Sequence, residues 1–302
     1  MNDINMKGNI LEEVVAMLVG AIELGGTNCN CAIGLPDGTI VKKIRFSTED
    51  PSVTIGHVIN FFTENKVTAL GIGSFGPINV DRRSSEYGTI LQSPKKEWVN
   101  YPLVQQLQKH LKIPILLYTD VTASGLGEYS ALEKSVSTVL YVTIGTGIGG
   151  GIVIKNEVPY SSHHAEMGHV TLQRVDGDVA ESVCPFHSNC LEGLASGTAI
   201  EKRWGQKAHT LSTDHQAWEW EADYIAQGLC QFIYTMAPDR IILGGGVMQQ
   251  PHLLAMIRRK VKEKIGGYYF YDELKCLEEL IVLPALDENS ALVGCLRMHN
   301  SK

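Results

Sequence analysis

The sequence predicts an α/β protein whose two halves repeat the same order of secondary structure. Near residue 18 an apolar strand, a glycine-rich turn and a returning strand lead on to a helix, and this order recurs near residue 137. We therefore expect duplicated βββαβα halves, each opening with a turn of the phosphate-binding type. The length of 302 residues suggests two domains that share an interface.

The first half opens with residues 18–24 (LVGAIEL), an apolar strand that ends in the turn Gly25-Gly26-Thr27-Asn28. Residues 29–35 return as a second strand, and Pro36-Asp37-Gly38 signals a turn into a third strand at 39–47. The remaining elements are expected at 51–62 (helix), 69–77 (buried strand and Gly-Pro loop), 79–101 (polar excursion near a ligand), 103–111 (helix), 114–120 (strand) and 121–134 (helix).

The second half repeats the opening of the first. Residues 137–145 form a predicted strand, 145–151 a glycine turn and 151–156 the returning strand. After a cysteine- and histidine-rich segment, the pattern becomes largely helical. We expect elements at 195–205 (helix), 218–238 (a long helix stopped by Pro238), 239–247 (strand with a third glycine turn), 251–265 (amphipathic helix), 281–286 (strand) and from about Asn289 (last helix).

No low-complexity linker separates the halves, so the domain boundary is expected in the ordered crossing near residues 120–137. We assign residues 1–17 to an N-terminal extension, 18–125 to an N-terminal domain and 126–302 to a C-terminal domain. The last helix could pack back on the N-terminal domain. The extension has neither a basic stretch nor a cleavage-like site, so no signal peptide is predicted and the extension is expected to carry no functional weight.

The composition is that of a soluble globular protein, with 44% hydrophobic and 20% charged residues. A net charge of −7 gives no electrostatic case for binding nucleic acid or an anionic membrane. No run of about 18 apolar residues indicates a transmembrane helix. The chain has seven cysteines, most of them in apolar stretches, which we interpret as reduced core residues of a cytoplasmic protein.

The segment from His169 to Cys190 offers four soft metal ligands. The compact C-x2-H-x2-C run supplies three of them, and His169 would be the fourth; the set is His169, Cys184, His187 and Cys190. Thiolate sulfur and imidazole nitrogen suit a tetrahedral structural zinc. Such a metal would also hold Glu166 and Glu192 near each other. The alternative is a surface loop with two free thiols, but cysteines clustered with histidine inside cells more often bind metal.

Three glycine turns follow apolar strands directly and are candidates for phosphate contact: Gly25-Gly26-Thr27, Gly145-Thr146-Gly147 with the glycines beyond it, and Gly244-Gly245-Gly246. Glycine lets backbone N–H groups approach phosphate oxygens and permits positive φ. Hairpins also need glycine, so one such turn is weak evidence, whereas three favour nucleotide binding. No P-loop motif occurs, and no GxGxxG run supports a dinucleotide site.

Asp120 ends an apolar strand and precedes a helix. A carboxylate in that position can accept the proton of a substrate hydroxyl that attacks phosphorus. It can equally cap the helix, which Asp often does. Spacing alone leaves both roles open.

Eight motifs occur in the order typical of one family: AIELGGTN, GIGSFGP, YGTILQSPK, YTDVTASGLGE, TIGTGIGGG, AEMGH, CPFHSNCLEGLASG and IILGGGVMQQ. Together they strongly resemble the ROK sugar kinases, and within them the bacterial fructokinases, from about residue 18 to the end. The resemblance implies the actin-like ATPase (ribonuclease H-like) fold, with two domains that close on ATP and sugar. It implies a hexose kinase, with fructose as the expected sugar and Mg²⁺ accompanying ATP.

The resemblance also implies roles for individual residues. Asp120 matches the family's general base, and the family zinc would be held by His169, Cys184, His187 and Cys190. Sugar contacts are implied for Gly76, Thr122, Glu166, His169 and Glu192. ATP contacts are implied for Gly25, Gly26, Thr27, Gly145, Thr146, Gly147, Thr198, Gly244, Gly245, Gly246, Val247 and Met248. A homodimer is expected, with sugar and nucleotide as the small-molecule ligands.

Departures from the family pattern bear on the choice of sugar. Thr122 stands where the family usually has Asn, Asn28 where it has Lys, and Thr198 where it has Pro; Ser162-His163-His164-Ala165 replaces a Gly-His-Pro run. These changes leave a kinase for mannose, glucose or an N-acetylhexosamine, or a degenerate sugar-binding protein, as alternatives. A sugar-responsive DNA-binding regulator is a further alternative, but about 17 residues before the core are too few for a helix-turn-helix.

Overall fold

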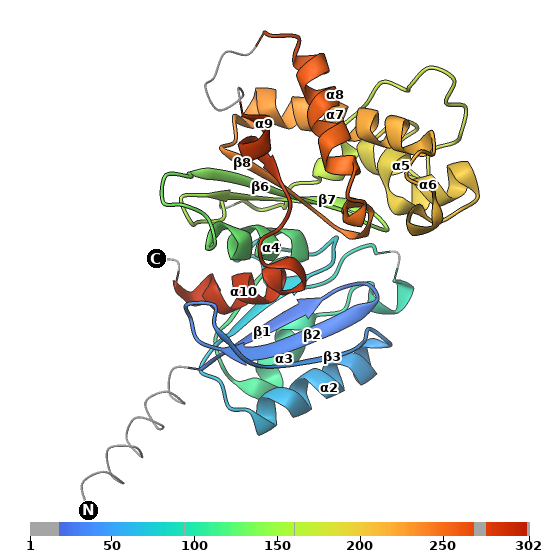
Figure 1. The fold of residues 1–302 in the computed structure, drawn as a ribbon. Helices are drawn as coiled ribbons and strands as arrows, with labels where there is room; N and C mark the ends of the chain where they lie inside the picture. Colours follow the sequence, from blue (N-terminus) through green and yellow to red (C-terminus); the bar gives the residue numbers. More distant parts are fainter. Residues whose placement is uncertain (1–17, 94, 160, 269–275, 301–302) are drawn as a thin grey trace, which may run out of the picture. The chain divides into compact units, whose positions relative to one another are not determined.

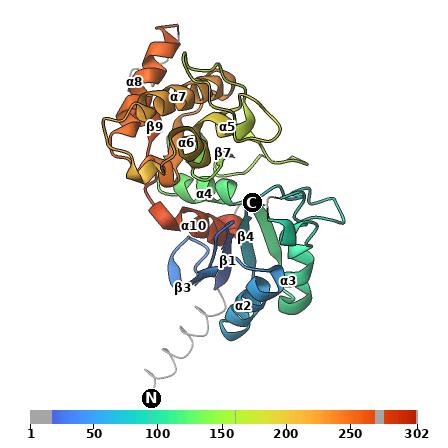
Figure 2. The ribbon, with the colours of Figure 1, turned by 90° about the vertical axis from the view of Figure 1, so that its right-hand side faces the viewer.

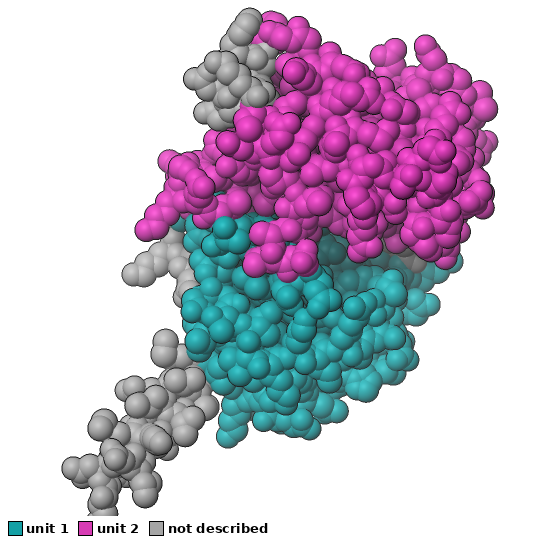
Figure 3. Space-filling model, in the orientation of Figure 1, with its two compact units in different colours: residues 1–131, 156–164, 288–302 teal, residues 132–155, 165–287 magenta. Residues whose placement is uncertain are grey.

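The computed structural model describes residues 18–93, 95–159, 161–268 and 276–300, so the expected N-terminal extension lies outside the described residues (Figure 1). The described chain forms two units (Figure 3). Unit 1 takes its residues from 1–131, 156–164 and 288–302, and unit 2 from 132–155 and 165–287. Each unit has its own hydrophobic core. The predicted domain boundary at residue 125 remains a prediction.

The sheet of unit 1 has five strands in the order β3-β2-β1-β4-β5. They are β1 (Val19–Leu24), β2 (Asn28–Gly34), β3 (Ile40–Ser47), β4 (Leu70–Ser74) and β5 (Ile115–Thr119). The meander β1–β2–β3 is antiparallel, and β4 and β5 add in parallel beside β1. Because β1 and β4 lie in the middle of the sheet and are covered on both faces, nearly all their residues are apolar or glycine.

Helices cover both faces of this sheet (Figures 1 and 2). One face carries α2 (Pro51–Glu64) and α3 (Leu103–Leu111), and the other carries α4 (Asp120–Tyr129) and α10 (Ser290–Arg297). The start of α2 follows from local sequence, because Asp50 caps the helix through the N–H of Ser52 and Pro51 suits the first turn. A short 3₁₀ turn, η1 (Lys96–Trp98), lies in the polar excursion predicted at 79–101.

The sheet of unit 2 has four strands in the order β7-β6-β8-β9. They are β6 (Thr138–Ile144), β7 (Ile148–Ile154), β8 (Arg240–Gly244) and β9 (Ile281–Val282). The helices of this unit are α5 (Leu191–Ala195), α6 (Gly197–Trp204), α7 (Ala217–Met236), α8 (Leu253–Ile265) and α9 (Leu277–Leu280). The predicted strand at 281–286 is therefore shorter than expected, and the predicted helix at 195–205 corresponds to α6 alone.

Strand pairing supports the predicted duplication. In unit 1, β1 pairs antiparallel with β2 and parallel with β4; in unit 2, β6 pairs antiparallel with β7 and parallel with β8. One part of the expectation is wrong: among the described residues, the second half has no counterpart of β3. After β7 the chain contributes Asn156–His164 to unit 1 and then returns to unit 2 in the segment that carries the predicted metal ligands.

Two glycines bring α4 and α10 into close contact within unit 1. A Cβ on Gly127 would lie 2.0 Å from the carbonyl oxygen of Ser290, and one on Gly294 would lie 1.8 Å from that of Ala123. Only glycine permits this approach of the two backbones. The position of α4, which begins at Asp120, therefore depends on packing against a helix more than 160 residues further along the chain.

None of the helices in the described part of the chain combines the length and the apolar character that spanning a membrane requires.

Candidate active site and metal centre

Asp120 is the first residue of α4, directly after β5. The helix cap is supplied by Thr119, whose Oγ1 accepts the N–H of Thr122 at 3.3 Å. Asp120 Oδ1 accepts the N–H of Val121 at 2.9 Å. The capping role that spacing left open for Asp120 is therefore filled by its neighbour Thr119.

The pKa of Asp120 is raised to about 7, chiefly because desolvation disfavours the charged carboxylate. The hydrogen bond from the Val121 N–H opposes this shift, and the charge of Glu23 adds to it. A carboxyl group with a pKa near 7 can hold and release a proton at neutral pH, as a general base must.

Glu23 is a residue that sequence reasoning left without a role. In the β1–β4 register it stands opposite Gly73, so the two residues face the same side of the sheet. A Cβ on Gly73 would lie 3.3 Å from Asp120 Cα and 3.4 Å from Cys295 Sγ. The missing side chain at Gly73 therefore lets the start of α4 approach the sheet beside Glu23, whose charge raises the pKa of Asp120. The only sequence signal was an acid at the end of a buried strand.

The environment of Glu23 keeps its carboxylate in place. Asn30 Nδ2 donates a hydrogen bond of 2.7 Å to Glu23 Oε2. Burial raises the pKa of Glu23, whereas the bond from Asn30 and the charge of Arg45 lower it and Glu288 raises it. Cys295 is fully buried on α10 and donates to the carbonyl of Ile22 at 3.3 Å.

Two predicted sugar contacts of unit 1 have partners within the protein. The Oγ1 atoms of Thr122 and Thr119 lie 2.8 Å apart, and Thr122 is only 8% exposed. Its hydroxyl thus takes part in the start of α4. Gly76 faces the His164 ring, since a Cβ there would lie 3.6 Å from His164 Nε2, which accepts the N–H of Ile78 at 3.4 Å. The family departure at residues 162–165 therefore reaches the loop of Gly76.

Hydrogen bonds from neighbouring residues fix the first glycine turn, while Gly26 and Thr27 remain exposed to solvent. The N–H of Gly25 donates to the carbonyl of Asn28 at 2.9 Å, which closes the hairpin between β1 and β2. Thr48 Oγ1 donates to the carbonyl of Gly25 at 2.7 Å, and the Thr48 N–H donates to the carbonyl of Thr27 at 2.9 Å. Gly26 and Thr27 are exposed, and a Cβ on Gly26 would meet nothing within 4 Å.

The second and third glycine turns lie side by side in unit 2, where a Cβ on Gly145 would stand 4.0 Å from the Gly246 nitrogen. The start of α6 braces the second turn through Gly197 N–H to Gly145 O at 2.6 Å and Thr198 Oγ1 to Thr146 O at 2.8 Å. In the third turn Gly245 has φ 92°, which glycine alone adopts readily. Gly244 also belongs to this turn. The side chains of Val247 and Met248 are buried, so these residues would contact a nucleotide through their backbone groups.

Glu192, which we predicted as a sugar contact, also braces the second glycine turn. Its Oε2 accepts the N–H of Ile148 at 2.9 Å and would lie 2.6 Å from a Cβ on Gly147. Gly147 is therefore needed to make room for a carboxylate. Sequence reasoning missed this contact because the residues are 44 positions apart. One carboxylate oxygen has this partner, and sugar binding by Glu192 stays a prediction.

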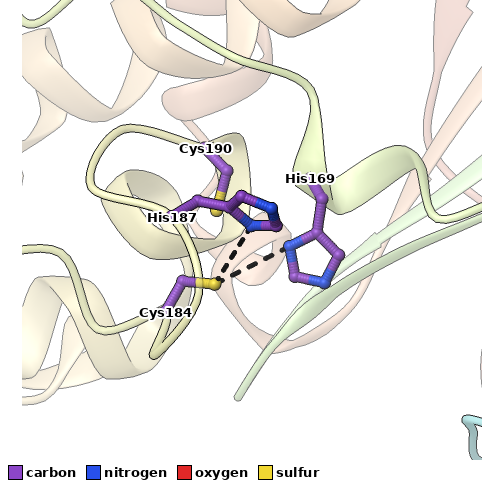
Figure 4. Close-up of side chains that lie close together, drawn as sticks. All are labelled: His169, Cys184, His187 and Cys190. Carbon is purple, nitrogen blue, oxygen red and sulfur yellow. Dashed lines mark hydrogen bonds between the residues drawn. The ribbon is translucent and has the colours of Figure 1, made fainter.

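The four predicted metal ligands come together in unit 2 (Figure 4). One ligand atom from each of His169, Cys184, His187 and Cys190 lies within 4.8 Å of the others. Cys184 Sγ is 3.4 Å from His187 Nδ1 and 3.9 Å from His169 Nδ1. Sulfur and nitrogen ligands at the corners of a zinc tetrahedron are about 3.6 Å apart. This donor set therefore fits a structural zinc, and the alternative of two unrelated thiols is less well supported.

The two nitrogens of His169 face different groups. Nδ1 faces the cysteine cluster, and Nε2 lies 3.9 Å from Glu166 Oε2. This arrangement is compatible with a ring that serves metal and sugar at once. Glu166 is exposed and directly precedes η2 (Met167–His169). The Cys190 end of the segment is fixed by the N-cap of α5, where Sγ accepts the N–H of Gly193 at 3.3 Å.

The predicted site residues thus fall into two groups. Unit 1 holds Asp120, Thr122, Gly76 and the first glycine turn. Unit 2 holds the four metal ligands, Glu166, Glu192, Thr198 and the other two glycine turns. Each group pairs glycine turns that suit phosphate with side chains that suit a sugar, which is the composition expected of a phosphotransferase.

Comparison with known proteins agrees with this chemistry. Fructokinases from Lactococcus lactis subsp. cremoris and Pediococcus pentosaceus are 41% and 40% identical to the chain, covering 93% of it and 96% of each relative. A relative from Bacillus subtilis (strain 168) is 45% identical over 281 residues, covering 92% of the chain and 94% of the relative.

Solved structures show the same fold. The ROK hexokinase from Thermus thermophilus matches with a TM-score of 0.75 at 22% identity, covering 93% of this chain and 97% of that one. A ROK family glucokinase from Streptomyces griseus, in complex with glucose and AMPPNP, matches with a TM-score of 0.71 at 22% identity, covering 92% and 97%. The ROK family model matches residues 19–301. The fold is therefore the actin-like sugar-kinase fold, and the chain belongs to the ROK family.

Proposed function

We propose that the chain is an ATP-dependent fructokinase, which converts D-fructose and ATP to D-fructose 6-phosphate and ADP. The observation that carries the proposal is the set of relatives named fructokinase, 40% and 41% identical over more than nine tenths of both chains. An alcohol-accepting phosphotransferase also accounts for a desolvated aspartate in a protein with three glycine turns.

Asp120 is the proposed general base. The oxygen of the sugar hydroxyl attacks the γ-phosphorus of ATP, its proton passes to the Asp120 carboxylate, and the bond from phosphorus to the ADP oxygen breaks. Its pKa of about 7 allows a substantial ionised fraction at neutral pH together with a strong affinity for the transferred proton.

The three glycine turns are the proposed nucleotide contacts. Gly26 and Thr27 present exposed backbone, and the paired turns at Gly145 and Gly246 lie next to the start of α6. Backbone N–H groups in such turns suit phosphate oxygens. Mg²⁺ accompanying ATP would neutralise phosphate charge there.

The sugar is proposed to contact Gly76, Thr122, Glu166, His169 and Glu192. Zinc held by His169, Cys184, His187 and Cys190 would be structural, since four protein ligands leave no open coordination position. Its task would be to fix the segment that carries Glu166 at one end and Glu192 at the other.

We further propose that the protein acts in the cytoplasm as a homodimer, with sugar and nucleotide as its ligands and without nucleic-acid or membrane partners. The net charge of −7 supports the last point. Sedimentation equilibrium at assay concentration tests the dimer, whose mass is expected at about twice the 33.1 kDa chain mass.

A coupled assay of ADP release with ATP, Mg²⁺ and a panel of fructose, mannose, glucose and N-acetylmannosamine tests the function. The proposal predicts the highest kcat/KM for fructose. Thr122 in place of Asn offers one hydroxyl instead of an amide, so we expect a raised KM and some use of mannose and glucose. No sugar-dependent ADP release with any hexose would instead favour the degenerate sugar-binding protein.

A further inference from the structure

The ammonium group of Lys95 is fixed near the first glycine turn. Lys95 is half-buried, and its Nζ donates a hydrogen bond of 2.8 Å to the carbonyl oxygen of Thr48. Thr48 in turn holds both ends of the turn, through its Oγ1 to Gly25 and its N–H to Thr27. One residue therefore links the Lys95 ammonium to the backbone proposed to contact phosphate.

The segment around Lys95 is anchored from a second side. Trp98 is completely buried, and its Nε1 donates to the carbonyl oxygen of Glu49 at 2.9 Å. Trp98 also packs edge-on against Phe75 and Tyr101. Lys95 and Trp98 thus bind the adjacent carbonyls of Thr48 and Glu49. Because buried Trp98 anchors this segment, the ammonium group of Lys95 is held at Thr48.

Lys95 has no counter-ion among the described residues, in which no carboxylate lies within 4.0 Å of its Nζ. A partly desolvated cation without an anion is unfavourable, and a bound anion would offset that cost. One of its three N–H donors is used by Thr48, so two remain for a ligand. The turn itself carries no cation, since Asn28 follows Thr27.

We propose that Lys95 binds the phosphoryl group that is transferred, as the γ-phosphoryl of ATP, as the phosphate of the sugar product, or as both in succession. The proposal rests on the proposed kinase function and names a residue of that site. An ammonium is a compact charge that suits phosphate oxygens, and it gains most where charge increases on those oxygens during transfer.

The test uses the full-length protein with Lys95→Met and Lys96→Met. Lys96 is the matched control, because it is the neighbouring lysine, exposed, and outside the proposed site. Calorimetry gives the affinities for AMPPNP, ADP, fructose 6-phosphate and fructose. Lys95→Gln, which keeps a donor for Thr48 without the charge, serves if the melting temperature shows that Lys95→Met does not fold.

We expect Lys95→Met to lower the affinity for AMPPNP, for fructose 6-phosphate or for both by roughly 10- to 100-fold, the range for losing a hydrogen bond between charged groups. ADP and fructose should change less than about threefold, and Lys96→Met should change none of the four. If affinity falls for only one of AMPPNP and fructose 6-phosphate, that ligand identifies whether Lys95 contacts the phosphoryl group before or after transfer. Unchanged affinity for both, equal loss of ADP and AMPPNP, or loss of fructose alone would overturn the proposal.

Failure of the proposed function is visible separately. Wild-type protein that binds nucleotide but phosphorylates no hexose would reject the kinase proposal whatever Lys95 does. Wild-type protein that turns over fructose, with Lys95→Met equal to it in kcat, KM for ATP and the affinities above, would reject only the role of Lys95.

Discussion

At the scale of single residues, Asp120 combines a position and a proton affinity that suit phosphoryl transfer. It begins α4 at the end of a buried strand, while Thr119 supplies the cap that Asp120 could have supplied. Its pKa of about 7 arises from desolvation first and from Glu23 second. Only the first of these causes could be anticipated from the strand-end position.

Replacing the proposed base tests this assignment directly. Asp120→Asn should lower kcat by roughly 10²–10⁴-fold, the usual range for loss of a general base, because the amide cannot accept the hydroxyl proton. Fructose affinity by calorimetry should stay nearly unchanged, since the shape of the residue is kept. Turnover within threefold of wild type would remove Asp120 from this role.

The pH dependence of kcat/KM reports on Glu23 as well. A base must be ionised in the free enzyme, so kcat/KM for fructose should rise with pH and level off above a midpoint near 7. Glu23→Gln removes a neighbouring negative charge and should move the midpoint to lower pH. Glu64→Gln, at an exposed position at the end of α2, is the control. A midpoint that Glu23→Gln leaves in place would show that Glu23 does not influence the base.

At the scale of elements, the segment that carries the proposed metal ligands is connected to the second glycine turn, a proposed nucleotide contact. Cys190 caps the N-terminus of α5, and two residues later Glu192 accepts the Ile148 N–H beside Gly147. Disorder at Cys190 would therefore reach the second glycine turn as well as Glu166 and Glu192, the acids proposed to bind sugar.

Metal analysis and a cysteine variant test this connection. Purified protein should contain about one zinc per chain. The Cys190→Ser variant should lose zinc and bind both AMPPNP and fructose more weakly. Cys276 lies outside the cluster, so Cys276→Ser should change neither the zinc content nor these affinities. Wild-type affinities in zinc-free protein would show that the segment holds its form without metal.

The contact between α4 and α10 gives a second prediction for elements. Gly294→Ala places a methyl group where the Ala123 carbonyl stands, so the helices must separate, and we expect a loss of about 1–3 kcal/mol in the free energy of unfolding. Gly56→Ala in α2 meets no atom within 4 Å and should be neutral or stabilising by up to about 1 kcal/mol. Denaturant titration compares them, and equal stability would argue against the close contact.

At the scale of the whole molecule, the chain returns at its end to the unit in which it began. The last helix, α10, packs on α4 and β1 in unit 1, and buries Leu292, Cys295 and Leu296 there. Lys43 on β3 also pairs with Glu288 at 2.7 Å. Unit 1 is therefore incomplete until the final residues have been added.

Removing the residues after 287 tests that dependence. Each buried apolar side chain of α10 contributes about 1.5–3 kcal/mol, so several together approach the whole stability of a typical domain. We expect the truncated chain to be insoluble or to lose its cooperative melting transition. Melting by circular dichroism at the wild-type temperature would show that unit 1 folds without α10.

The sequence by itself determined the features that rest on local signals. Strands and helices followed from apolar periodicity, the hairpin at Gly25 from its glycines, and the four metal ligands from cysteine and histidine spacing. Family motifs then singled out Asp120 as the predicted general base. The expectation failed at the third strand of the second half, because periodicity cannot tell which unit receives residues 156–164.

Tertiary structure alone decided the contacts between distant segments. Glu192 meets Gly147, Glu23 raises the pKa of Asp120, and Lys95 is linked to the first turn through Thr48. These contacts depend on strand register, on missing side chains at single glycines, and on carbonyl groups that every residue has. None of them leaves a pattern in composition or spacing, since the partners are brought together only when the sheets and helices pack.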